Sequence, residues 1–368
     1  MNQEIKRIAI STGGGDAPGL NAVIHSVVYA AERVGWEVYG IRQGYDGILF
    51  SGQYTDGGMI RLTVPAVENI AHLGGTVLGT TNRGNPFKIV TRLPDGTVRE
   101  EDRSMDLVEG LKQRGIDALV AVGGDGSLTI ADQLHDLGVR VVGVPKTIDN
   151  DLESTLLTFG FNSAFSFATE CIDRLKATAA SHRRIMVVEV MGRYVGWIAL
   201  NCGIASRADA ILIPEIPYDI RKVAEHLKKV TSGSREHAIV VVAEGAKPLG
   251  GELVVKSKEA GRVERLGGIG EMVARQLQEL TGRESRAVVL GHLLRGGSPT
   301  ALDRILGLSF GAAAVYALKQ GQNGVMVALN PPRINFVPLK EAVARLKAVP
   351  VDGEGVLVAR VLDVCFGD

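Results

Sequence analysis

The chain has 368 residues, of which 45% are hydrophobic and 22% are charged, which is enough for a large core and for more than one lobe. Lysine and arginine together number 41, as do aspartate and glutamate, so the formal charge is zero and bulk electrostatics favours neither nucleic acid nor a membrane as a partner. Cys171, Cys202 and Cys365 lie far apart without a CxxC or zinc spacing, which favours a reducing, cytoplasmic location.

The N-terminal segment MNQEIKRIAIS has only a short apolar run, which predicts a first strand and not a signal peptide. We expect no membrane helix, because no stretch approaches the roughly 20 apolar residues that one needs. Further short apolar runs, each closed by glycine or a polar turn, predict strands that are covered on both faces. With the first strand, they are residues 8–11, 118–124, 141–145, 185–192, 210–215, 238–245 and 287–292.

Helical patterns separate these runs, and they lie at residues 21–33, 105–115, 162–180 and 301–321. The alternation predicts an α/β fold with two Rossmann-like lobes, each a mostly parallel sheet flanked by helices. Two segments interrupt the pattern. Residues 84–104 predict a polar hairpin that turns at residues 94–96, and residues 247–268 are a glycine-rich, charged excursion. Plain surface loops without chemistry are the simplest interpretation of both.

The first candidate site is the turn GGGDAPG at residues 13–19, between the first strand and the first helix. A glycine-rich turn before a helix presents backbone N–H groups and the positive end of the helix dipole, which suits phosphate. The turn is neither a GxxxxGK[ST] loop nor a clean GxGxxG, so a dinucleotide site is weakly supported. Taken alone, it could also be a purely structural turn.

The second motif is GGDGS, residues 123–127, directly after an apolar strand. Gly124 and Gly126 allow a phosphate or nucleotide to approach the backbone, and Asp125 at a strand end is suited to hold Mg²⁺ beside phosphates. The motif indicates phosphoryl chemistry better than it indicates a substrate. A simple strand-ending turn is the alternative.

The third motif is PKTIDND, residues 145–151, which again follows a short apolar run. Two carboxylates two residues apart, with a hydroxyl and an amide, pack poorly but suit a catalytic loop. One aspartate can accept the proton of an attacking hydroxyl while the other groups position it. A structural role would require the loop to solvate both carboxylates.

Charged side chains also occur at the ends of the later apolar runs. Cations there are costly unless they meet an anion, and the arginine fork fits phosphate, although any single one could be an ordinary surface residue. A helix is expected over residues 194–206, so that Gly192 and Arg193 lie near its start. The other candidates of this group are Arg184, Met191, Glu244, Arg286, His292 and Arg295.

The segments GGGDAPGLNAVI, GGDGS, PKTIDND, MGRYVG and GHLLRGGSPTALDR resemble, in this order, motifs of the phosphofructokinase family, from about residue 7 to about residue 320. The resemblance implies a glycolytic kinase that phosphorylates the 1-hydroxyl of fructose 6-phosphate with MgATP. It also implies an active site in the cleft between the two lobes and a homo-oligomer, with a tetramer as the expected form. The expected donor lobe is residues 1–160 plus 294–346, and the expected fructose 6-phosphate lobe is residues 161–293 plus 347–368.

Catalytic roles follow from the same resemblance. Asp149 is similar to the general base, Thr147 and Asp151 would hold the reacting end of the sugar, and Asp125 would bind Mg²⁺. The Gly15 backbone, together with Arg83, would stabilise the transferring phosphoryl group, and Arg193 would also stabilise the developing charge. The expected donor contacts are Gly15, Tyr45, Arg83, Gly124, Asp125, Gly126, Ser127 and Lys146.

Substrate contacts are implied in two groups. Met191, Gly192, Arg193 and Glu244 would contact the fructose. Arg184, Arg286, His292 and Arg295 would hold its 6-phosphate, with the first two of these supplied by a neighbouring subunit. This arrangement is chemically reasonable, because phosphoryl transfer depends mainly on positioning and charge neutralisation.

The identity of the donor depends on two positions. Gly126 is similar to the ATP-dependent members, because a missing side chain leaves room for the inner phosphate, whereas Lys146 is similar to the pyrophosphate-dependent members. We give the glycine more weight, because a carboxylate there would repel the α-phosphate, whereas a lysine only adds a cation near phosphates. ATP is therefore the expected donor, and pyrophosphate is the alternative.

Two further expectations concern regulation and competing functions. Bacterial members often bind nucleotide effectors through arginines that correspond here to His25 and Tyr29, which argues against ordinary ADP activation and phosphoenolpyruvate inhibition. His25 could also be an ordinary helix residue. A lipid or NAD kinase would share only the GGDG turn, and a non-catalytic regulatory subunit should have lost Asp125 or Asp149.

Overall fold

The computed structural model describes residues 4–82, 84–92, 97–252, 255–257 and 265–368. It divides into two compact units, each built around its own sheet. Unit 1 is Met1–Asn162 with Arg295–Leu346, and unit 2 is Ser163–Leu294 with Lys347–Asp368. The functions that the sequence assigns to two lobes stay predictions.

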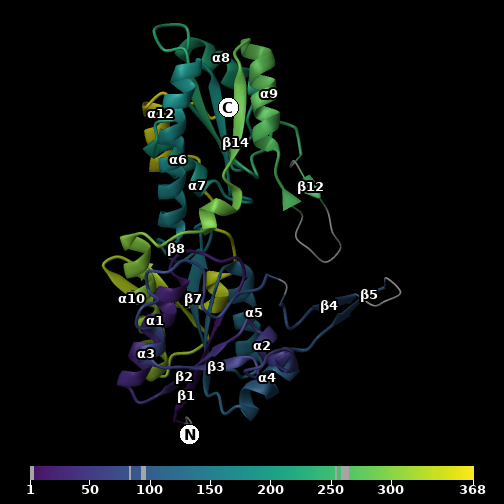
Figure 1. Cartoon of the computed structure of the whole chain (residues 1–368), viewed down its shortest axis with the longest axis vertical. Helices are drawn as coiled ribbons and strands as arrows, with labels where there is room; N and C mark the ends of the chain where they lie inside the picture. Colours follow the sequence, from purple (N-terminus) through teal and green to yellow (C-terminus); the bar gives the residue numbers. More distant parts are fainter. Residues whose placement is uncertain (1–3, 83, 93–96, 253–254, 258–264) are drawn as a thin grey trace. The chain divides into compact units, whose positions relative to one another are not determined.

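The sheet of unit 1 has the strand order β16-β15-β7-β6-β1-β2-β3. Figure 1 labels β1, β2, β3 and β7 of this sheet. Its central strands are parallel, and the two edge strands β3 and β16 pair antiparallel. The strands are β1 (Arg7–Thr12), β2 (Glu37–Ile41), β3 (Met59–Leu62), β6 (Ala118–Gly123), β7 (Val141–Thr147), β15 (Val325–Asn330) and β16 (Arg333–Pro338), and β8 (Phe159–Gly160) pairs with β7.

Helices cover both faces of this sheet, which explains why its strands are continuous apolar runs. On one face, Ile8 and Val120 lie in a core cluster with residues of α1 (Leu20–Arg33) and α10 (Ala301–Lys319). On the other face, Ala9 and Leu119 lie in a cluster with residues of four further helices. These are α2 (Asp46–Leu49), α4 (Ser104–Gln113), α5 (Asp125–Asp136) and α11 (Leu339–Ala342), and the unit also contains α3 (Val64–Val67) and η1 (Ser51–Gln53).

Helix α10 corrects one expectation from the sequence. Among the described residues it is the one helix that is long and apolar enough to cross a membrane, so the expectation that no stretch approaches this length was wrong. Half of the most apolar stretch of this helix is buried in the protein. Glycines let α10 approach α1 closely, because a Cβ atom at Gly311 would lie 2.1 Å from Ser26 Oγ. The apolar composition of α10 therefore contributes to the core of unit 1.

Unit 2 contains a parallel four-stranded sheet in the order β10-β11-β9-β14. Helices α8 and α9 pack on the face that carries Ala210 and Leu212, and α7 packs on the face that carries Ile211. The elements are β9 (Ile185–Val190), β10 (Ala210–Leu212), β11 (Ala238–Ala243), β14 (Ser285–Val289), α6 (Phe161–His182), α7 (Trp197–Ala205), α8 (Ile220–Val230), α9 (Ile269–Thr281), η2 (Gly291–Arg295) and α12 (Glu354–Val361). The predicted α/β fold class with mostly parallel, helix-flanked sheets is confirmed.

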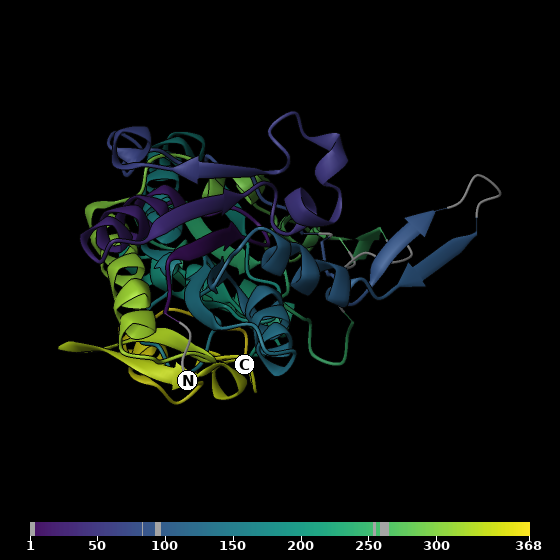
Figure 2. The same ribbon diagram turned by 90° about the horizontal axis from the view of Figure 1, so that it is seen from below.

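The two predicted insertions both contain paired strands. The hairpin is confirmed, because β4 (Ile89–Arg92) pairs antiparallel with β5 (Val98–Glu101), and its turn at residues 93–96 lies outside the described residues. Figure 2 shows this hairpin extending away from the sheet of unit 1. In the second insertion β12 (Val255–Ser257) pairs with β13 (Arg265–Leu266), so this excursion also contains paired strands, and the expectation that neither segment carries chemistry stays a prediction.

Candidate active site

Three neighbouring strands of unit 1 each end in one of the three sequence motifs. Strands β7, β6 and β1 are adjacent and parallel, so their carboxyl ends lie at the same edge of the sheet. The chain places β2 on one side of β1 and β6 on the other, which makes the end of β1 a topological switch point. Open α/β sheets bind ligands at such points. The sheet order therefore brings the glycine turn, the GGDGS motif and the PKTIDND motif together.

The glycine turn after β1 is held by its own hydrogen bonds. The Gly13 N–H donates to Val122 O (2.9 Å), and the Gly14 N–H donates to Thr81 O (3.0 Å). Two of the three glycine N–H groups are thus used within the protein, which corrects the expectation of a turn with bare N–H groups. Among the described residues no partner is found for the Gly15 N–H, so Gly15 is the glycine best suited to meet a phosphate oxygen.

Small residues allow this turn to pack against the start of α5. A Cβ atom at Gly13 would lie 2.7 Å from Ser127 Oγ, and one at Gly123 would lie 2.2 Å from Ser127 Cβ. Ser127 therefore fills the space between the ends of β1 and β6. The glycines are needed for this close approach as well as for any ligand.

Residues 73–82 also support the turn, and the sequence reasoning missed them. The Thr80 hydroxyl donates to Gly14 O (2.6 Å). The Asn21 side chain accepts from the Val77 N–H (2.9 Å) and donates to Gly74 O (3.2 Å). The polar run GTTN at residues 79–82 was the available signal, and it precedes Arg83, which lies outside the described residues.

Asp125 and Gly126 begin helix α5 at the end of β6. Burial raises the pKa of the Asp125 carboxyl group, and the charge of Asp151 raises it further, so the two carboxylates are neighbours. No described atom lies within 4 Å of a Cβ atom built at Gly126, and its φ is not in the left-handed region. Neither packing nor backbone conformation requires glycine at this position.

Lys146 is the second residue of the third motif and lies within strand β7. The structure extends β7 to Thr147, two residues beyond the predicted run, because Lys146 and Thr147 pair with β8. The Lys146 side chain is 3% exposed, and its Nζ donates to Gly15 O (2.5 Å). Burial, together with the charge of Arg295, lowers the pKa of Lys146 to about 8. The lysine amine is thus bound to the backbone of the glycine turn.

A short network holds the loop that carries Asp149. The Asp149 N–H donates to the Thr147 hydroxyl (3.1 Å), and Asn150 adopts a positive φ of 53°. The Asn150 Oδ1 accepts from the Thr158 N–H (3.1 Å), and the Thr158 hydroxyl donates to Thr147 O (2.7 Å). Thr147, Asp149 and Asn150 belong to the predicted motif, whereas Thr158, which also fixes the loop, was not predicted for the site.

The donor set in this part of unit 1 fits a magnesium ion. Burial raises the pKa of Asp151, and its buried Oδ1 has no hydrogen-bond partner among the described residues. The described residues contain no group of three acidic, histidine or cysteine side chains of the kind that forms an all-protein metal cage. Mg²⁺ usually binds through one or two carboxylates together with substrate phosphates, so Asp125 with Asp151 nearby is sufficient.

Two residues that were predicted to bind the 6-phosphate or the phosphoryl donor lie at unexpected positions in unit 1. Arg295, predicted for the 6-phosphate, donates from Nη1 to Asp16 O (3.1 Å), and its guanidinium would lie 2.7 Å from a Cβ atom at Gly15. Tyr45, predicted as a donor contact, lies in a core cluster, and burial raises the pKa of its hydroxyl. Gly124 precedes α5 in extended backbone conformation.

Unit 2 collects a second group of candidates at the carboxyl edge of its sheet. Met191 follows β9, Glu244 follows β11, and His292 lies in η2 after β14. The turn is tight, because Gly192 has a φ of 142° and its carbonyl accepts from the Gly245 N–H (3.0 Å). Arg193 follows this glycine, with its guanidinium over the Tyr194 ring at 5.1 Å. The sheet thus brings the predicted fructose contacts together.

Arg184 and Arg286 lie at the opposite edge of the same sheet. Arg184 immediately precedes β9, and Arg286 is the second residue of β14, whereas Arg193 follows the other end of β9. A strand of this length spans roughly 20 Å. Within one chain these two arginines therefore cannot reach the anion that Arg193 and His292 would face.

Comparison with a family model shows which protein family the chain belongs to. The model described as Phosphofructokinase matches residues 7–318. This chain belongs to the phosphofructokinase family. The prediction from the five ordered motifs is confirmed.

Two curated relatives illustrate the similarity. One from Chloroflexus aurantiacus, named ATP-dependent 6-phosphofructokinase, is 48% identical over 368 residues, covering 100% of this chain and 99% of the relative. One from Amycolatopsis methanolica, named pyrophosphate–fructose 6-phosphate 1-phosphotransferase, is 49% identical over 348 residues, covering 94% and 96%.

Solved structures agree with this family. The crystal structure of Pichia pastoris phosphofructokinase in the T-state matches with a TM-score of 0.79 and 32% identity over 98% of this chain. This phosphofructokinase-family chain covers only 37% of that yeast chain.

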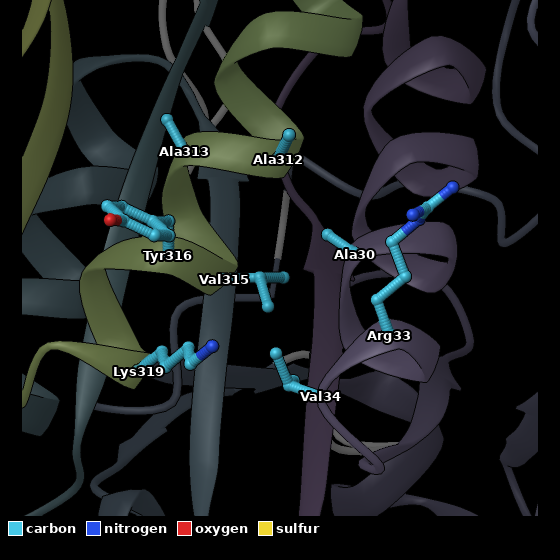
Figure 3. Close-up of a pocket in the computed structure, with 8 residues that line it drawn as sticks. All are labelled: Ala30, Arg33, Val34, Ala312, Ala313, Val315, Tyr316 and Lys319. Carbon is cyan, nitrogen blue, oxygen red and sulfur yellow. The ribbon is translucent and has the colours of Figure 1, made fainter.

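One cavity in unit 1 lies away from the three motifs. It has a volume of about 410 Å³ and is lined by residues of α1 and α10 and by Val34, which follows α1 (Figure 3). Its lining includes the apolar Ala312 and Val315 and the polar Arg33, Tyr316 and Lys319. Both helices end here, and helices of a parallel α/β sheet run back against its strands. The cavity therefore lies at the amino edge of the sheet and is not the candidate active site.

His25 and Tyr29 form a packed pair on α1. Their rings stack with centroids 4.4 Å apart, and His25 Nδ1 lies 2.8 Å from Val67 O. A stacked histidine–tyrosine pair therefore differs from the two cationic arginines to which the sequence comparison relates these positions. Whether effectors bind here stays a prediction.

Proposed function

We propose that this cytoplasmic enzyme transfers the γ-phosphoryl group of MgATP to the 1-hydroxyl of fructose 6-phosphate, which yields fructose 1,6-bisphosphate in glycolysis. The observation that carries the proposal is the meeting of three strand ends in unit 1. There Gly15, Asp125 and Asp149 follow adjacent parallel strands, and phosphoryl transfer needs a phosphate cradle, a metal-binding carboxylate and a base in one place.

Asp149 takes the proton of the sugar 1-hydroxyl as that oxygen attacks the γ-phosphorus. Its loop is held by Thr147, Asn150 and Thr158, so the carboxylate does not have to be reorganised during the reaction. Thr147 and Asp151 hold the reacting end of the sugar. Mg²⁺, when bound by Asp125 and the donor phosphates, neutralises charge on the transferring group.

Charge on the transferring phosphoryl group is met by backbone and by arginine. The Gly15 N–H and the side chains of Arg83 and Arg193 perform this role in the proposal. Arg295 lies against Gly15 and can assist there as well as at the 6-phosphate. Met191, Gly192 and Glu244 contact the fructose, with His292 near its 6-phosphate.

The complete sugar site belongs to a homo-oligomer, with a tetramer as the expected form. Arg184 and Arg286 lie at the amino edge of the unit 2 sheet, roughly 20 Å along the strand from Arg193. These two arginines therefore serve the 6-phosphate in the active site of a neighbouring copy of the chain.

ATP is the proposed donor because of the open space at Gly126. The protein itself does not need glycine at this position, since a side chain there would meet no described atom and no backbone strain. The remaining reason for glycine is room for a ligand, and ATP has an inner phosphate and a nucleoside that pyrophosphate lacks. Ser127 and Gly124 would line the same approach.

Turnover with a single donor tests this proposal. With fructose 6-phosphate as acceptor, we expect activity with MgATP and much less with Mg-pyrophosphate. Gly126→Asp should fold normally and lose ATP-dependent turnover far more than any pyrophosphate-dependent turnover, because the new carboxylate opposes the α-phosphate. Activity with pyrophosphate alone, or equal losses for both donors, would contradict the choice of ATP.

A pyrophosphate-dependent transferase is the second candidate. The observation that favours it is Lys146, whose amine is buried directly behind the glycine turn at Gly15. Sequence identity does not separate the candidates, because relatives with either name are about equally similar, at 48% and 49%.

A further inference from the structure

A carboxylate connects the two arginines at the amino edge of the unit 2 sheet. Glu284 Oε2 lies 2.6 Å from Arg184 Nε, and Glu284 Oε1 lies 2.5 Å from Arg286 Nη2. Each carboxylate oxygen therefore binds one guanidinium, and both oxygens are used. Each arginine still has most of its five N–H donors available for another anion.

The sheet register explains why the three side chains meet. Strands β9 and β14 are parallel neighbours with Ile185 opposite Ser285, and the Ile185 N–H donates to Glu284 O (3.0 Å). Arg184 thus lies opposite Glu284. Arg286 lies two residues further along β14, and side chains two residues apart in a strand point to the same face.

Stability does not account for this cluster. The side chains of Arg184, Glu284 and Arg286 are 27%, 40% and 56% exposed, and ion pairs this exposed contribute little to folding. The arginines lower the pKa of Glu284, and His182 contributes in the same direction, so the carboxylate stays ionised near neutral pH. Without it, two adjacent guanidinium groups would repel each other and occupy many rotamers.

We infer that Glu284 is a positioning residue for the 6-phosphate of fructose 6-phosphate, because it holds Arg184 and Arg286 as one preorganised double fork. This inference rests on the proposed function and names a residue that itself does not touch the substrate. The cluster carries two positive charges and one negative charge, so a phosphate dianion is still attracted. When the two guanidinium groups are already held at the correct spacing, less conformational entropy is lost when phosphate binds.

Glu284→Gln tests the inference, since an amide has one acceptor and one donor end and can satisfy only one of the two arginines. We expect the KM and the calorimetric Kd for fructose 6-phosphate to rise roughly tenfold, which is the scale of one lost charged hydrogen bond. kcat and the KM for the phosphoryl donor should stay within about twofold, because a contact to the 6-phosphate, away from the reacting oxygen, binds the ground state and the transition state equally. Glu284→Asp keeps the charge but is one methylene shorter, so we expect weaker binding in that variant too.

Glu236→Gln is the matched control. Glu236 forms an exposed ion pair with Arg183 (3.0 Å), whereas Arg184 and Arg286 each pair with Glu284, so loss of the Glu236 charge should leave sugar binding unchanged. Unchanged or tighter sugar binding in both Glu284 variants would overturn the inference, and tighter binding would mean that Glu284 competes with phosphate. A parallel loss of kcat, or dissociation of the oligomer in size-exclusion chromatography, would also overturn it. Turnover by the unaltered protein tests the proposed function separately, since the ratio of calorimetric Kd values needs no catalysis.

Discussion

Single residues at the ends of β1, β6 and β7 carry the chemistry, and their neighbours determine their geometry. Asp149 illustrates this division. Its backbone N–H is bound by Thr147, and the following Asn150 is held at positive φ by the contact of its side chain with Thr158. The motif predicted the aspartate, but Thr158 is eight residues beyond Asn150 and belongs to no recognisable pattern. Sequence reasoning therefore identified the reacting groups and their neighbours within the motif, but it missed Thr158.

Asp149→Asn should lower kcat by about 10²–10⁴-fold with fructose 6-phosphate binding largely kept, because the amide cannot accept the hydroxyl proton. The measurement is steady-state kinetics together with calorimetric binding of the sugar phosphate. Asp106→Asn, at an exposed aspartate of α4 paired with Arg103, is the control and should leave turnover unchanged. Normal turnover in the Asp149 variant would eliminate the proposed mechanism.

Secondary-structure elements were predictable where their burial is uniform. The strands β1, β6, β9 and β11 are buried at nearly every position and appeared as apolar runs. The edge strands β3 and β16 were missed because they are only partly buried and contain arginine, asparagine and proline. Strand β2 alternates glutamate, tyrosine and glycine with apolar residues. Strand β15 did carry an apolar signal, VMVAL, that the pattern search could have found.

Helices α1 and α10 depend on glycine for their close packing, which leads to a prediction about stability. Gly311→Ala should destabilise the protein by about 1–3 kcal/mol, because the added methyl would overlap Ser26 Oγ and Val23 O. Urea denaturation measures the change. Gly126→Ala is the matched control: it is also a glycine-to-alanine change within a helix, but it enters open space and should be neutral or stabilising by up to about 1 kcal/mol. Similar effects of both changes would show that α1 and α10 can separate at little cost.

At the scale of the whole molecule, the sheet edges decide which residues can act together. Gly15, Asp125 and Asp149 share the carboxyl edge of unit 1, and Met191, Arg193 and Glu244 share the carboxyl edge of unit 2. Arg184 and Arg286 lie at the amino edge of unit 2. The proposed active site therefore needs more than one copy of the chain.

Hybrid oligomers test this requirement. Asp149→Asn and Arg286→Ala should each be nearly inactive as pure proteins. After mixing, dissociation and reassembly, activity should recover to roughly a quarter of the unaltered rate, because a quarter of the sites combine an intact Asp149 with an intact Arg286 from the neighbouring copy. Native mass spectrometry confirms that mixed oligomers have formed. Mixed oligomers without activity would show that each chain forms its site alone.

The sequence by itself determined the α/β fold class, the family and the three phosphate-facing motifs, because these depend on residues that are close together along the chain. Only the tertiary structure decided that the Gly13 and Gly14 N–H groups are used within the protein, that Lys146 lies behind Gly15, and that Glu284 connects two arginines. These contacts depend on strand order and register, which join residues up to 131 positions apart, and no local pattern encodes them.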